Sequence, residues 1–376
     1  MQFTYNPLNS STGEIRLIQW LPTESDNDDG EEIRCQLMHV SLDDEGLKYD
    51  ALSYTWGDPQ PSQKISMGGI LVDVGPNLYG ALKQLHHANR NLWVDSLCIN
   101  QQDLRERETQ VSLMRSIYKK ADTVIMWLGE ENDDSKIAMP FLKTFREALH
   151  LRSGEKVSQI MLNEEFNLCW AAVGKLFQQP YWSRVWIVQE VLLAQRPVVY
   201  WGTGVVDWNF FRFLLININE KDLRFMSTAA QEVLLLPTAD LARTIARLCN
   251  QRFGGRPMSL IDCFVIGHQR STTDPRDHIY GVLSLVDDAG IVPDYSISAE
   301  KLYRNVVQHT IEQYENLDIL SACNVENAMA VQFLTVSLHH IDPIIHKLTM
   351  QGTIRSSFRR SKSSPFLGPR LESLAR

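Results

Sequence analysis

Polar and aromatic side chains gather in this sequence where short apolar stretches end. Tyr54, Trp56 and Asp58 come at the end of Y-D-A-L-S-Y or just after it, and Asp95 follows N-L-W-V. In a parallel sheet, ligands bind in the crevice outside the carboxyl ends of the strands, near a reversal of strand order. If these stretches are parallel strands, their polar ends form the lip of one site. The structural alternative is that Asp95 caps the turn that follows it and that Trp56 packs beneath the neighbouring loop.

Glu190 lies inside an otherwise apolar helix start, R-V-W-I-V-Q-E-V-L-L. Trp186 precedes it by four positions, so the two side chains share one face of a helix. A poorly solvated carboxylate has a raised pKa unless a cation pairs with it, and Arg184 is a candidate for that cation. Glu190 is therefore either half of a structural ion pair or the acid of a site.

Several classes of protein are disfavoured. The sequence contains no G-x-S-x-G, G-x-x-x-x-G-K-[ST] or H-E-x-x-H motif, and its six cysteines have no C-x-x-C spacing, so we expect no metal site and reduced thiols. A net charge of −8 argues against a general nucleic-acid binder. We expect no signal peptide and no membrane span, because no apolar stretch reaches about 20 residues. A cytoplasmic location is the simplest expectation.

The hydrophobic pattern predicts an α/β protein. Strands and helices alternate between residues 49 and 205, which is typical of a largely parallel sheet flanked by helices. Gly68-Gly69 between two apolar stretches predicts a hairpin. Asn77 is expected to cap the next helix, and Asp103-x-x-Glu106 is expected to form a capping box.

The 376 residues allow about two domains, and the pattern divides them into four parts. We predict a β-rich extension over 1–48, an α/β domain over 49–205 with a helical insertion at 131–179, and an α-helical subdomain over 206–324. Residues 325–376 are irregular and end in a serine-rich basic stretch. Disorder is the preferred interpretation of that tail, and a basic arm for an anionic membrane or nucleic acid is the alternative.

Three blocks together resemble the heterokaryon-incompatibility (HET) domain of filamentous fungi. They are Y-D-A-L-S-Y-T-W-G-D (Tyr49–Asp58), L-W-V-D-S-L-C-I-N-Q-Q-D-x-x-E-R-x-x-Q-V (Leu92–Val111) and S-R-V-W-I-V-Q-E (Ser183–Glu190). The likeness continues more weakly through T-D-P-R-D-H-I-Y-G-V-L-S-L and P-D-Y-S to residue 324. This resemblance implies a fungal intracellular protein of nonself recognition, whose activation triggers programmed cell death.

The same blocks are similar to TIR domains of innate immunity, which implies a TIR-like or flavodoxin-like fold. In enzymatic TIR domains, a glutamate four positions after a tryptophan serves cleavage of the nicotinamide–ribose bond of NAD. By this resemblance Glu190 would be catalytic, and NAD would be a substrate, with no cofactor. The substrate-binding residues would be Tyr54, Trp56, Asp58, Asp95, Arg184 and Trp186: the aromatics stacking on a flat ring, Asp95 holding a ribose hydroxyl.

A second interpretation from another functional class stays open. In it the same surface is a non-enzymatic signalling module that binds other incompatibility or death-signalling proteins, or a second copy of the chain. The insertion at 131–179 departs from a minimal TIR domain. A metabolic hydrolase is disfavoured, because no nucleophile–base pair is visible in the sequence.

Overall fold

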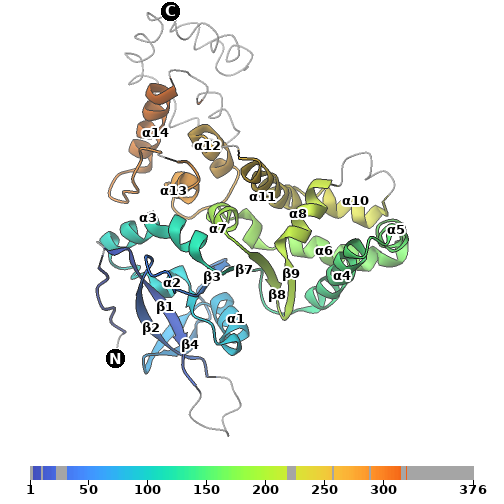
Figure 1. The fold of residues 1–376 in the computed structure, drawn as a ribbon, viewed down its shortest axis with the longest axis horizontal. Helices are drawn as coiled ribbons and strands as arrows, with labels where there is room; N and C mark the ends of the chain where they lie inside the picture. The colour runs from blue at the N-terminus through green and yellow to red at the C-terminus, as the bar shows by residue number, and fades with distance from the viewer. Residues whose placement is uncertain are drawn as a thin grey trace, which may run out of the picture. The chain divides into compact units, whose positions relative to one another are not determined.

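The computed structural model describes residues 3–9, 12–22, 32–217, 226–255, 258–287, 289–314 and 319. The chain folds as two compact units, Met1–Arg256 and Pro257–Arg376 (Figure 1). The predicted tail at 325–376 lies outside the described residues.

The described part of the first unit is built on a nine-stranded sheet in the order β5-β4-β2-β1-β6-β3-β7-β8-β9. Its four central strands, β6-β3-β7-β8, are all parallel to one another. Antiparallel pairs flank them on both sides, and β2 also pairs with β4 in parallel, so the sheet is mixed and the α/β prediction is confirmed. The strands are β1 (Glu14–Trp20), β2 (Arg34–Ser41), β3 (Asp50–Tyr54), β4 (Gln63–Met67), β5 (Ile70–Val74), β6 (Leu92–Trp93), β7 (Thr123–Trp127), β8 (Pro197–Trp201) and β9 (Gly204–Asp207).

The order of the parallel strands creates a switch point. Among the parallel strands, the next one after β3 in the chain is β6, on one side of β3, and the one after that is β7, on the other side. Among the parallel strands alone this is the order 2-1-3-4, as in flavodoxin-like sheets, which bind ligands where the connections diverge. The loops that follow β3, β6 and β7 therefore meet at one edge of the sheet.

Helices cover both faces of this central sheet. Helix α7 contacts β3 and β7 on one face and packs against α3, while α1 lies on the opposite face. The faces alternate along each strand, so Ser53 faces α7 whereas Asp50 and Trp127 face the side of α1. The helices of this part are α1 (Pro76–Leu85), η2 (His86–Ala88), α2 (Asp95–Cys98), α3 (Leu104–Lys120) and α7 (Ile187–Leu193).

The residues predicted as an N-terminal extension contribute β1 and β2 to the same sheet. Strand β1 lies between β2 and β6, and Ile15, Leu17 and Ile18 are fully buried. The β4–β5 hairpin extends this side of the sheet, as predicted from Gly68-Gly69. Both glycines have positive φ, 59° and 79°, which a tight hairpin turn requires.

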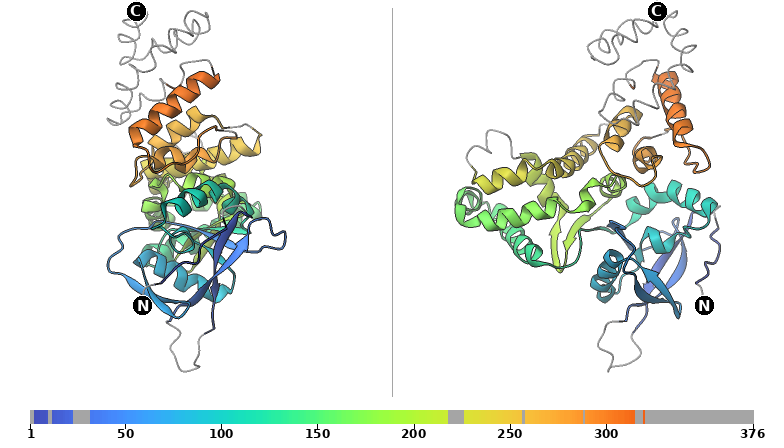
Figure 2. Two further views of the ribbon diagram at one scale, coloured as in Figure 1. Left: turned by 90° about the vertical axis from the view of Figure 1, so that its left-hand side faces the viewer. Right: turned by 180° about the vertical axis from the view of Figure 1, so that it is seen from behind.

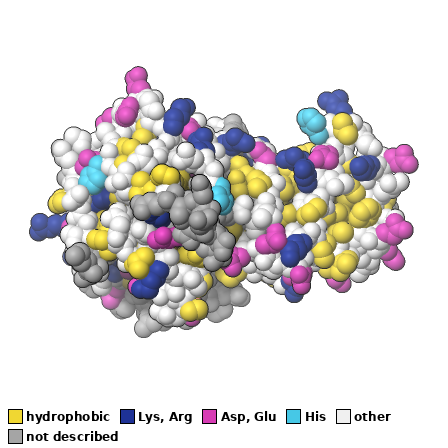
Figure 3. Space-filling model, turned by 90° about the horizontal axis from the view of Figure 1, so that it is seen from below, with side chains coloured by type: hydrophobic (Ala, Val, Ile, Leu, Met, Phe, Trp, Pro, Cys, Tyr) yellow, Lys and Arg dark blue, Asp and Glu magenta, His cyan; other side chains and the backbone are white. Residues whose placement is uncertain are grey.

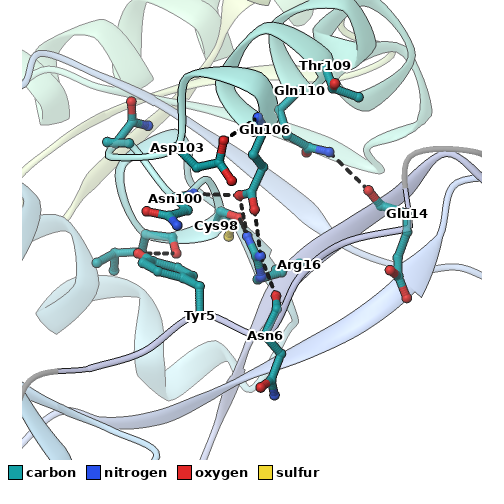
Figure 4. Close-up of polar contacts among 12 residues, drawn as sticks. Tyr5, Asn6, Glu14, Arg16, Cys98, Asn100, Asp103, Glu106, Thr109 and Gln110 are labelled. Atoms are coloured by element: carbon teal, nitrogen blue, oxygen red, sulfur yellow. Dashed lines mark hydrogen bonds and ion pairs between the residues drawn. The ribbon is translucent and has the colours of Figure 1, made fainter.

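Burial of β1 places a charged residue, Arg16, in the interior (Figure 4). Arg16 is 1% exposed and forms a two-bond ion pair with Glu106 of α3, at 2.6 and 2.9 Å. It also donates to the carbonyls of Cys98 and Asn6, and the ring of Tyr5 lies 4.8 Å from its guanidinium carbon. This cluster connects β1, α2 and α3 through charge-assisted hydrogen bonds.

The capping box predicted at the start of α3 is half correct. The Asp103 side chain accepts from the backbone N–H groups of Arg105 and Glu106, as an N-cap should. Glu106, however, accepts from Arg16 and from the Asn100 N–H. The buried cation is the stronger partner, and no local pattern could identify a residue 90 positions away.

A helical layer lies beside β8 and β9 in Figure 1 and in the view from behind in Figure 2. Helices α4 and α10 pack on α6, and α11 packs on α8 and α7. The predicted helical subdomain begins at residue 206, but these contacts join residues 206–217 and 226–255 to the first unit. The helices are α4 (Asp133–His150), α5 (Gly154–Leu162), η3 (Glu164–Phe166), α6 (Asn167–Phe177), η4 (Pro180–Ser183), α8 (Trp208–Asn217), α10 (Thr228–Leu234) and α11 (Pro237–Phe253).

The second unit contains α12 (Leu260–His268), α13 (Asp277–Leu283) and α14 (Ala299–Tyr314). Arg276, from the D-P-R-D block, donates to both Asp274 oxygens and to the carbonyls of Tyr295 and Ile297. The Tyr295 hydroxyl in turn donates to Asp277 at 2.7 Å. These bonds join the T-D-P-R-D block to the P-D-Y-S block within the second unit.

We expect the Arg16–Glu106 pair to control the stability of the first unit. Arg16→Met leaves the largely buried Glu106 carboxylate without its cation, which should lower the free energy of unfolding by about 3–5 kcal/mol. Urea denaturation followed by circular dichroism measures the change.

Two variants serve as references for Arg16→Met. Lys64→Ala removes the exposed Lys64–Asp73 pair and should cost at most about 1 kcal/mol. The double variant Arg16→Met/Glu106→Leu should recover part of the loss, because no unpaired charge remains. Equal stability of Arg16→Met and wild type would contradict the central role of the pair.

Candidate functional site

The structure brings three of the predicted lip residues together at the carboxyl ends of β3 and β6. The Trp56 indole Nε1–H donates to Asp95 Oδ2 at 2.9 Å, and the Tyr54 hydroxyl donates to Ser96 Oγ at 2.8 Å. Asp95 is the first residue of α2 and also accepts from the Ser96 N–H at 2.7 Å. Trp56 remains 47% exposed, so one aromatic surface borders this site.

Asn77 braces the loop that follows β3. Its Nδ2 donates to the Thr55 carbonyl at 2.6 Å, and its Oδ1 accepts from the Trp127 indole at the end of β7 at 2.9 Å. The prediction that Asn77 caps α1 is therefore wrong, since Gly75 occupies the N-cap position. Between the two strand ends, Gly57 turns the loop with a φ of +68°, which glycine adopts without strain.

Glu190 lies beneath this edge of the sheet and is only 2% exposed. Its Oε2 accepts a hydrogen bond from Ser53 Oγ, and Ser53 Oγ also lies 2.7 Å from the Tyr181 hydroxyl. Burial raises the pKa of Glu190 from 4.5 to about 7, although the Arg184 charge and the hydroxyls of Ser53 and Tyr118 partly oppose the shift. Near neutral pH, the carboxyl group is thus poised between its two protonation states.

Arg184 provides the positive charge of the site. Its guanidinium donates to the Tyr54 carbonyl, at the last residue of β3. Burial raises the pKa of Asp95, and the Arg184 charge and the Trp56 indole hold that rise back. Arg184 is therefore an electrostatic neighbour of both Asp95 and Glu190, and two carboxyl groups share one guanidinium.

Two further predicted residues take other places. Asp58 is exposed, and its Oδ1 accepts from the Gln60 N–H at 2.9 Å within its own loop. Trp186 is half-buried at the N-cap of α7, and its carbonyl accepts from the Glu190 N–H at 3.3 Å. The four-residue spacing of Trp186 and Glu190 is thus present in the backbone.

The sequence reasoning missed Ser53, Tyr118, Tyr181 and Asn77. Ser53 had a visible signal, because it is a hydroxyl inside a strand in which all five residues are buried, and a buried hydroxyl requires a partner. Tyr118 lies on α3, where helical spacing predicts an apolar contact and does not reveal the partner of its hydroxyl. The partners of Tyr181 and Asn77 depend on strand order, which no local pattern reveals.

The described residues include no group of three or more His, Cys, Asp or Glu side chains suited to a metal ion. They also include no helix long and apolar enough to cross a bilayer. On the face shown in Figure 3, acidic and basic side chains are interspersed, with no broad patch of one sign.

Residues 49–190 match the family model described as heterokaryon incompatibility protein (HET). This stretch of the chain is a HET domain. The matched range begins one residue before β3 and ends at Glu190, so the strand-end site lies within the HET domain.

A curated relative supports this assignment over a longer range. "Heterokaryon incompatibility protein 6, OR allele" of Neurospora crassa is 26% identical over 353 residues, covering 79% of this chain and 51% of the relative. The chain thus spans about half the length of that relative. No solved structure matches it.

We expect Glu190 to make the stability of the HET domain depend on pH. The unfolded chain loses this proton near pH 4.5, whereas the folded protein holds it until about pH 7. The contribution of Glu190 to the free energy of unfolding is therefore most favourable below pH 4.5. It falls as the pH rises from 4.5 to about 7 and is constant above that pH. The loss is on the order of 3 kcal/mol.

Glu190→Gln tests this expectation, because glutamine imitates the protonated acid. Free energies of unfolding at pH 5 and pH 8 should show the variant gaining roughly 2–3 kcal/mol on wild type as the pH rises. Glu155→Gln, which changes an exposed carboxylate on α5, serves as the control. A wild-type–variant difference for Glu190→Gln that is the same at both pH values would contradict the raised pKa.

Proposed function

We propose that this HET-domain protein acts in the cytoplasm in fungal nonself recognition and that its activation triggers programmed cell death. The match of residues 49–190 to the HET family and the likeness to a Neurospora incompatibility protein support this role. Its partners in this proposal are other incompatibility proteins or further copies of itself.

The proposal extends to chemistry at the strand-end site: cleavage of the nicotinamide–ribose bond of NAD, with Glu190 as the catalytic carboxylate. The observation that carries it is the Glu190 carboxyl group, whose pKa is raised to about 7 and which lies beside Arg184 and Asp95 at a topological switch point. Trp56, half exposed, would stack on a flat ring of the substrate. Arg184 would meet a phosphate, and Asp95 a ribose hydroxyl.

The reaction would proceed by departure of nicotinamide with the electron pair of the N-glycosidic bond. Positive charge then develops on the ribose, and the ionised Glu190 carboxylate stabilises it. Water adds to the ribose carbon, and its proton passes to Glu190 or to solvent. Because Glu190 is 2% exposed, the residues that cover it must move before substrate reaches it.

The burial of Glu190 also favours a second candidate, the non-enzymatic signalling module. Its carboxyl group already accepts from Ser53, as a structural residue would. In this alternative Trp56 is the anchor for a protein partner, since half-exposed tryptophans are frequent energetic centres of interfaces.

Turnover of NAD by purified protein tests the enzymatic proposal. Wild type should release nicotinamide, and Glu190→Ala should reduce the rate at least about 100-fold, since a positioned acid or base contributes that much. Release is measured by chromatography, with Glu155→Ala as an exposed-carboxylate control.

Two results would contradict this mechanism. Equal turnover in wild type and Glu190→Ala would remove Glu190 from it. Absence of turnover in wild type, even after induced self-association, would favour the signalling module.

Expression in a fungal host tests the cell-death role. We expect the wild-type chain to slow growth and Trp56→Ala to relieve the slowing, because both candidate functions use this exposed indole. Leu71→Ala, which truncates a 60% exposed leucine on β5, is the matched control. Colony growth is compared at equal protein level and equal thermal midpoint, and undiminished toxicity of Trp56→Ala would exclude Trp56 from the site.

A further inference from the structure

A cavity of about 230 Å³ lies at the amino ends of the parallel strands. Its floor is made of side chains on the α1 face of the sheet, including Asp50, Leu92, Ile125 and Val198. Register explains this floor, because Asp50 pairs with Leu92 and Ile125 pairs with Val198 in adjacent strands. The end of α1 closes the cavity through Leu85.

The cavity is distinct from the strand-end site. Strand β3 begins at Asp50 in the cavity and ends at Tyr54 in that site. Four residue steps of roughly 3.3 Å separate the two by about 13 Å along the strand. No residue of the HET-domain site described above lines this cavity.

The charges of the cavity are unequal. Arg90 is paired with carboxylates, because it donates twice to Asp50, at 2.7 and 3.0 Å, and once to Asp122, at 2.7 Å. Arg196 also lines the cavity, is exposed, and forms no ion pair with any described carboxylate. With Asp50 neutralised by Arg90, the lining keeps one unsatisfied positive charge.

Two aromatic side chains border the same space. Trp20 is held in place by its Nε1–H, which donates to the Arg90 carbonyl at 2.8 Å. Tyr200 lies on β8 and pairs with Val205 of the edge strand β9. The apolar floor, the two aromatic side chains and the Arg196 guanidinium fit a ligand with a flat apolar body and one anionic group.

We propose that this cavity binds a small organic anion, with a carboxylate or phosphate on Arg196 and a flat ring over the apolar floor of the sheet. The volume is below the roughly 300–1,000 Å³ typical of drug-sized ligands, so a single ring fits the space and a dinucleotide does not. The site is thus separate from the proposed NAD chemistry, and its occupancy does not depend on that proposal.

Isothermal titration with phenyl phosphate and with benzoate tests the site, and benzyl alcohol serves as the neutral probe of the same size. At least one anion should bind with a Kd on the order of 1 mM or tighter. The tighter of the two identifies the anionic group, and benzyl alcohol should bind at least about tenfold more weakly. Failure of both anions to bind, or binding of the alcohol as tight as that of the anions, would overturn the proposal.

Two variants locate the binding. Arg196→Gln should weaken the anion about tenfold or more by removing a charge-assisted bond, whereas Arg105→Gln, an exposed arginine on α3, should leave the affinity unchanged. Val205→Trp fills the cavity from its edge strand and should abolish binding without changing the charge. Circular dichroism melting confirms that each variant is folded. Unchanged affinity in both cavity variants would show that the anion binds elsewhere.

Discussion

The burial of one carboxyl group, that of Glu190, is the constraint on which the centre of the HET domain depends. A group that is 2% exposed must find hydrogen bonds inside the protein, and Ser53 supplies one from the middle of β3. This bond connects α7 to the central strand. Arg184, six residues earlier, donates to the Tyr54 carbonyl, and its charge opposes the rise in the pKa of Asp95. The polar edge of the sheet and the buried acid are therefore one electrostatic unit.

A second buried carboxylate shows how differently such a group can be treated. Glu106 forms a direct two-bond ion pair with Arg16, which satisfies both oxygens and connects the N-terminal strands to α3. Glu190 is bound by neutral hydroxyls, and its pKa rises to about 7. Desolvation among hydroxyls leaves the proton of Glu190 exchangeable near neutral pH. The ion pair of Glu106 suits a structural role, and the environment of Glu190 suits proton transfer or a pH-dependent change.

The mixed sheet places two kinds of surface at opposite ends of the same strands. At the carboxyl ends, Gly57 turns the loop with a positive φ, and the hydrogen bond between Trp56 and Asp95 holds both side chains at the switch point. At the amino ends, the Asp50–Arg90 bond neutralises a charge and leaves Arg196 facing an apolar floor. Strand β3, buried along its whole length, connects the two ends. The sheet thus supports both surfaces and keeps them apart.

The sequence by itself determined the α/β class, the Gly68-Gly69 hairpin, the convergence of polar residues at strand ends and the unusual position of Glu190. These follow from hydrophobic period, glycine conformation and spacing, which are local properties of the chain. Only the tertiary structure decided that β1 and β2 join the central sheet, that Asn77 braces a loop instead of capping a helix, and that Arg16 takes Glu106 from its expected cap. It also decided that Ser53 and Tyr181 surround the acid. Each of these depends on which strands become neighbours, and a side chain takes the strongest partner that folding brings near it, however distant that partner is in sequence.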